Sequence, residues 1–131
     1  MNLSLALRLG RISNLPTVWT NVLVGVMLGG GSLADSRLAL LMVALSLFYV
    51  GGMFLNDAFD RDFDAKHRPE RPIPSGQVSA HEVFIAGFGL LALGMAGVAL
   101  AGRVPDGAPA WTALASAAAL AAGFAAAGSA R

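Results

Sequence analysis

The sequence predicts an all-α membrane protein with about four transmembrane helices, for three reasons. Hydrophobic residues make up 56% of the chain, well above their usual share in a soluble domain. Charged residues make up 13%, about half of their usual share. Apolar runs recur at close to the roughly 20 residues that a helix needs to cross a bilayer. Glycine-rich or proline-rich segments separate some of these runs, as at 29–31 and 69–74.

We place the spans at residues 14–31, 38–58, 83–102 and 108–128, within a single membrane domain that covers residues 1–131. Pro16 suits the first turn of the first helix. Asn21 lies in the same span and needs either a hydrogen bond to another helix or a polar cavity, because an unpaired amide is costly in hydrocarbon. The fourth span is rich in alanine, so it inserts only marginally unless other helices receive it.

Small residues in the second and third spans predict close packing between helices. Gly51-Gly52 allows a neighbouring helix to approach, and the small-xxx-small pairs Ala92–Ala96 and Gly97–Ala101 favour the same kind of contact. Ser79 and Glu82 have the spacing of a capping box. We therefore expect a helix to begin just before the third span.

Two segments outside the spans have distinct features. Residues 1–14 form either a short amphipathic helix in the membrane interface, with Arg8 and Arg11 beside apolar side chains, or a frayed tail. Further along, three prolines cannot continue the second helix: Pro69, Pro72 and Pro74. We expect the chain to leave that helix near Arg68 and to cross in extended form to the third span.

The distribution of Lys and Arg predicts the orientation in the membrane. Two lie in the N-terminal segment and four in the loop at 56–82, against one in each of the other two loops. Basic residues favour the cytoplasmic side, so we expect the N-terminus and this loop to be cytoplasmic in an integral protein of the cytoplasmic (inner) membrane. There is no basic block with interleaved aromatics, which argues against nucleic-acid binding. The absence of cysteine excludes disulfides and thiol chemistry within these residues.

The charged segment, residues 56–76, holds five of the eight acidic residues and four of the nine basic ones. If the second helix continues through it at about 100° per residue, Asp57, Asp60 and Asp64 fall within roughly 60° of one another, whereas Asp62 points away. Like charges on one stripe weaken a helix by a few tenths of a kcal/mol per pair. The pattern therefore predicts a cationic partner for the three carboxylates.

A magnesium-bound diphosphate suits this segment. Mg²⁺ is commonly held by one or two carboxylates together with water and the phosphate oxygens of a substrate. Arg68 and Arg71 follow the acidic stripe, and the planar fork of arginine matches phosphate oxygens. Asp62 and Glu70 are expected to be solvated and outside the site.

The motif also resembles a known family. Asn56-Asp57-x-x-Asp60-x-x-x-Asp64, followed by Arg68-Pro-x-Arg71-Pro-x-Pro-Ser-Gly76, is similar to the first aspartate-rich motif of the UbiA-type intramembrane prenyltransferases. The stretch from Arg11 to Asn21 is similar to the first helix of that superfamily. The resemblance covers most of residues 8–85.

The resemblance implies the first half of a UbiA-type helical bundle, with Mg²⁺ as cofactor and a prenyl diphosphate as donor. The acceptor is expected to be hydrophobic or aromatic. Four residues would hold the metal, and the three acids among them are the candidate catalytic residues: Asn56, Asp57, Asp60 and Asp64. Four residues would contact the diphosphate: Asn21, Asn56, Arg68 and Arg71.

The chain departs from the family in one respect. Family members carry a second aspartate-rich motif that faces the first, and the acid that follows Glu82 here is the isolated Asp106. Three interpretations stay open: a truncated N-terminal half of a prenyltransferase, a non-catalytic module that binds Mg²⁺-diphosphate lipid or assembles with a second chain or copy, and a structural four-helix membrane protein.

Overall fold

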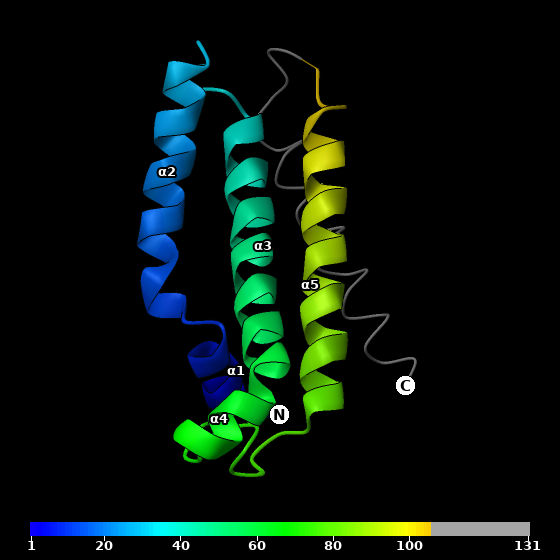
Figure 1. Ribbon diagram of the computed structural model, residues 1–131. Helices are drawn as coiled ribbons and strands as arrows, with labels where there is room; N and C mark the ends of the chain where they lie inside the picture. Colours follow the sequence, from blue (N-terminus) through cyan, green and yellow to red (C-terminus); the bar gives the residue numbers. More distant parts are fainter. Residues whose placement is uncertain (106–131) are drawn as a thin grey trace.

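The computed structural model describes residues 1–105, and no strand occurs in this part of the chain. The elements, in order, are α1 (Leu3–Leu9), the 3₁₀ turn η1 (Ile12–Asn14), α2 (Leu15–Leu28), α3 (Arg37–Phe59), α4 (Arg61–His67) and α5 (Ala80–Ala101). The three long helices α2, α3 and α5 run alongside one another, and the short α1 and α4 lie at one end (Figure 1). The predicted all-α class is therefore confirmed for the described residues.

Two of the described helices are long and apolar enough to cross a membrane, namely α3 with 23 residues and α5 with 22. Helix α2 has 14 residues and is shorter than the roughly 20 that a straight span needs. The predicted fourth span at 108–128 lies outside the described residues. The count of four spans thus stays a prediction.

Glycine governs the contact between α3 and α5. A Cβ atom on Gly51 would lie 2.9 Å from the carbonyl oxygen of Gly87, so only glycine permits this backbone approach without a shift. Within residues 1–105, a Cβ on Gly52 would meet no atom within 4 Å, so in this part of the chain the predicted close packing is seen at Gly51 and not at Gly52. In α5, Gly97 and Ala101 are buried as expected, whereas Ala92 and Ala96 are exposed and lie off the α3–α5 contact.

The N-terminal segment packs firmly against the end of the bundle, so the frayed-tail alternative is wrong. Leu5 and Leu9 of α1 are buried in a core cluster with four residues of α3, α5 and the preceding loop: Phe54, Ala58, Val78 and Val83. The N-terminal ammonium pairs with Glu82 at 3.0 Å, and Arg8 donates to Gln77 at 2.9 Å. The N-terminus and the charged segment consequently share one end of the molecule, as the predicted topology requires (Figure 1).

The proline-rich connection departs from the predicted extended crossing. Helix α4 ends at His67 with Arg68 as its C-cap, as expected, but residues 69–78 then fold into successive turns. The amide of Ser75 donates to the carbonyl of Arg71 at 2.9 Å, and that of Gln77 to Pro72 at 3.0 Å. The fixed φ of proline suits turns as well as extended chain, and a folded loop keeps Arg71 close to α3 and α4. The cap of α5 is confirmed, since Ser79 Oγ accepts from the amide of Glu82 at 3.1 Å.

Candidate functional site

The Asp-rich motif, residues 56–64, spans the junction between α3 and α4. The Asp60 amide donates to Asn56 at 2.9 Å and the Asp64 amide donates to Asp60 at 2.8 Å, so the helical path continues across a break at Asp60. Asp57 and Asp64 point inward and are 8% and 1% exposed. Asp60 and Asp62 are exposed. The predicted stripe is thus divided into two buried acids and one exposed acid.

Arg71 bridges the two buried carboxylates. Its Nη1 atom lies 3.1 Å from Asp57 Oδ1 and 3.1 Å from Asp64 Oδ2. Two nearly buried carboxylates would repel each other strongly without a cation between them. The sequence predicted a cationic partner for the stripe, and in the described structure that partner is an arginine of the same chain.

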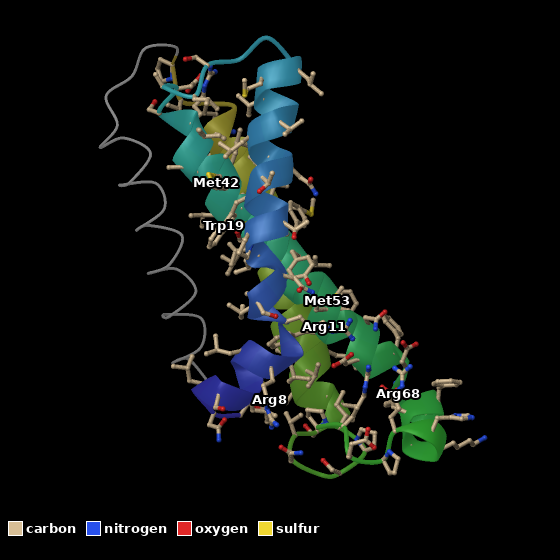
Figure 2. All side chains as sticks on the ribbon, turned by 90° about the vertical axis from the view of Figure 1, so that its left-hand side faces the viewer. Arg8, Arg11, Trp19, Met42, Met53 and Arg68 are labelled. Carbon is tan, nitrogen blue, oxygen red and sulfur yellow. The ribbon has the colours of Figure 1, made fainter. Side chains whose placement is uncertain are left out.

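Arg11 also reaches the motif, and its contact was missed by the sequence analysis. Its Nη2 atom lies 3.5 Å from Asp57 Oδ1, the oxygen that Arg71 contacts. The backbone of Arg11 is left-handed, with φ 48°, and among residues 1–105 it is the one non-glycine residue with positive φ. This turn between α1 and η1 directs the side chain toward α3 (Figure 2). The sequence showed only that Arg11 stands at the start of the stretch that resembles the family. That position did not predict a contact with Asp57, which lies 46 residues further along the chain.

Asp64 holds an oxygen with no hydrogen bond. Its Oδ1 atom is buried and accepts from no donor among residues 1–105, and Arg68 Nη1 lies 3.9 Å from it. Arg68 is half-exposed and lies at the end of α4, at the same end of the molecule as Arg8 and Arg11 (Figure 2). A buried carboxylate oxygen ordinarily has a partner. Here the unused oxygen lies next to an arginine that retains free donors.

Asn56 and Asp60 form a separate, exposed pair. Asn56 Nδ2 donates to Asp60 Oδ2 at 3.3 Å, one helical turn apart. Among residues 1–105, no group of three or more Asp, Glu or His side chains lies in an arrangement that holds a metal ion as it stands. The exposed pair still offers an amide oxygen and a carboxylate, which are ligand types that Mg²⁺ accepts when water and phosphate complete its shell.

Asn21 is not brought to the motif. It is exposed on α2 and lines a groove of about 460 Å³ between α2 and α3 with apolar neighbours, and no residue of the charged segment borders that groove. His67 stacks on Phe63 at 4.2 Å between ring centroids. The structure therefore places Asn56, Asp57, Asp60, Asp64, Arg68 and Arg71 at one end and Asn21 apart from them.

Comparisons with known proteins identify the family of this chain. The model of the UbiA prenyltransferase family matches residues 18–128, and the chain therefore belongs to this family. The digeranylgeranylglyceryl phosphate synthase of Methanopyrus kandleri is 37% identical over 89 residues, which are 68% of this chain and 32% of that enzyme. The enzyme of the same name from Ignicoccus hospitalis is 41% identical over 73 residues, 54% of this chain and 24% of the relative.

The chain thus matches about a third or less of the length of these curated relatives. No solved structure is significantly similar to it.

Proposed function

We propose that this chain supplies the first half of a prenyltransferase site, which binds the diphosphate of a prenyl donor together with Mg²⁺. The observation that carries the proposal is the convergence of Arg11, Arg68 and Arg71 on Asp57 and Asp64, at one end of a bundle of apolar helices. Membership of the UbiA prenyltransferase family supports the same activity.

The residues present fit a magnesium ion at the exposed pair. In the proposal, Asn56 and Asp60 hold Mg²⁺ with water and phosphate oxygens, which is its common mode of binding beside one or two carboxylates. Asp57 and Asp64 join the donor set when Arg71 turns from them toward the diphosphate. Asn21 would contact the diphosphate only after a rearrangement, so we assign it no role in the arrangement described.

The reaction is the transfer of the prenyl group to an acceptor. Bound Mg²⁺ supplies charge stabilisation to the departing diphosphate. Arg68 and Arg71 hold the diphosphate oxygens through paired N–H donors. The bond between C1 of the prenyl chain and the diphosphate oxygen breaks, and its electron pair leaves with the diphosphate. A nucleophilic atom of the acceptor then bonds to C1 and gives up its proton.

The proposal also concerns the acceptor of the prenyl group and the acidic group that would face the Asp-rich motif. An aromatic ring is the acceptor that the family resemblance suggests, whereas the relatives' name refers to a glyceryl phosphate product. Because these 131 residues hold one acidic motif, we propose that a facing acidic group comes from outside them, either from the same polypeptide or from a second chain. The charged end would face the cytoplasm, in the inner membrane.

The test is binding of geranylgeranyl diphosphate to the detergent-purified chain, with Mg²⁺ and with EDTA. We expect binding that requires Mg²⁺ and is weakened at least about tenfold in Asp60→Asn, because a charged metal ligand is lost. Asp62→Asn is the matched control. Asp62 is also exposed and lies two residues after Asp60, so this substitution removes the same charge from a side chain outside the proposed metal site. Equal affinity of Asp60→Asn, Asp62→Asn and wild-type protein would refute the proposal.

A further inference from the structure

A hollow beside the N-terminal segment carries side chains that the proposed diphosphate site leaves unused. It has a volume of about 730 Å³ and is bordered by Arg8 and Arg11, by Ser4, Ser13 and Asn14, and by aliphatic side chains of α1 and η1. Among residues 1–105, no acidic residue borders it. Its polar wall therefore carries net positive charge.

The polar side chains around this hollow have more hydrogen-bond donors than they use in the described structure. A guanidinium has five N–H donors. Arg8 uses one of them on Gln77 at 2.9 Å, and Arg11 approaches Asp57 with one nitrogen at 3.5 Å. Within residues 1–105, the side chains of Ser4, Ser13 and Asn14 form no hydrogen bond. Two arginines with adjacent hydroxyls and an amide match the oxygens of a phosphate group.

The apolar side of the hollow favours a ligand with a hydrocarbon chain. Leu3 and Leu7 of α1 are 75% and 45% exposed, although Leu5 and Leu9 on the opposite face are buried in the core. Exposed leucines beside arginines are typical of a helix that lies in the membrane interface. Helix α1 lies at the end of the apolar helices α3 and α5, where the headgroup layer of a bilayer would be (Figure 1).

We propose that this hollow is a binding site for an anionic phospholipid of the surrounding bilayer. The phosphate lies against Arg8, Arg11 and Ser13, and an acyl chain follows Leu3 and Leu7. The site needs no metal ion. It adjoins the Asp-rich motif through Arg11, which contacts Asp57 and also borders the hollow.

The experiment is a binding titration of the full chain in neutral detergent with dioctanoyl phosphatidic acid, in EDTA. Arg8→Gln is expected to weaken binding about tenfold or more, as for loss of a hydrogen bond to a charged group. Ser13→Ala, which removes no hydrogen bond within the described residues, is expected to weaken binding severalfold without affecting the fold. Arg103→Gln removes an exposed arginine at the opposite end and is expected to bind like wild type.

Two further ligands and one further variant identify what is bound. Dioctanoylglycerol, which lacks the phosphate, should bind at least about tenfold more weakly than phosphatidic acid. Inorganic phosphate that binds as tightly as the lipid would overturn the proposal in favour of a site for the free anion. Asp60→Asn should bind phosphatidic acid like wild type, which separates this site from the proposed diphosphate site. Equal binding by wild type, Ser13→Ala and Arg8→Gln would also overturn the proposal.

Discussion

At the scale of single residues, the charged end depends on one arginine. Arg71 contacts both Asp57 and Asp64, and these carboxylates retain little exposure to water. Arg68 approaches Asp64 at 3.9 Å with a side chain that is half-exposed. Breaking a buried ion pair by removing one partner is costly because an uncompensated charge remains, whereas exposed pairs contribute little. The two arginines of the motif should therefore differ in their effect on stability.

We expect Arg71→Gln to lower the free energy of unfolding by about 3 kcal/mol, and Arg68→Gln by less than about 1 kcal/mol. Thermal unfolding in detergent, compared between the two variants and wild type, measures the difference. Adding Asp64→Asn to Arg71→Gln should recover part of the loss, because it removes one of the two buried negative charges that Arg71 compensates in the wild type. Equal destabilisation by Arg71→Gln and Arg68→Gln would contradict the predicted difference between the buried bridge and the half-exposed ion pair.

At the scale of elements, the contact between α3 and α5 is set by small residues on one face of each helix. Gly51 lies against the backbone of Gly87, with Leu90 Cβ also 3.0 Å from the place a Cβ atom would take. Gly52 is next in the chain, and a Cβ atom on it would have no neighbour within 4 Å in the described part of the chain. Because successive residues on a helix differ by about 100° in direction, adjacent glycines have different neighbours. Substitutions at Gly51 and Gly52 therefore distinguish the effect of packing on stability from the effect of helix propensity.

Gly51→Ala is expected to destabilise the protein by about 1–3 kcal/mol, since the methyl group forces the two backbones apart. Gly52→Ala should be neutral or stabilising by up to about 1 kcal/mol, because alanine is the better helix former. Unfolding by heat in the same detergent provides the comparison. A loss of stability in Gly52→Ala equal to that in Gly51→Ala would contradict the assigned α3–α5 contact.

At the scale of the whole molecule, periodicity and local chemistry predicted the long helices, the cap at Ser79 and a cationic partner for the acids of the charged segment. These features depend on residues close in sequence. The contact of Arg11 with Asp57 depends on the docking of α1 by Leu5 and Leu9, and no local pattern encodes that docking. The separation of Asn21 from the motif likewise follows from the position of α2 beside the middle of α3, where Trp19 donates to Ser46 at 2.9 Å.

The central claim is that the exposed pair Asn56 and Asp60 holds a divalent cation together with a diphosphate. Mn²⁺ is a paramagnetic substitute for Mg²⁺, so ³¹P relaxation of pyrophosphate in the presence of the purified chain reports the metal beside the phosphates. We predict that Mn²⁺ enhances this relaxation with wild-type and Asp62→Asn protein, and that the protein-dependent enhancement is lost with Asp60→Asn. Equal enhancement with Asp60→Asn and wild type would contradict the account.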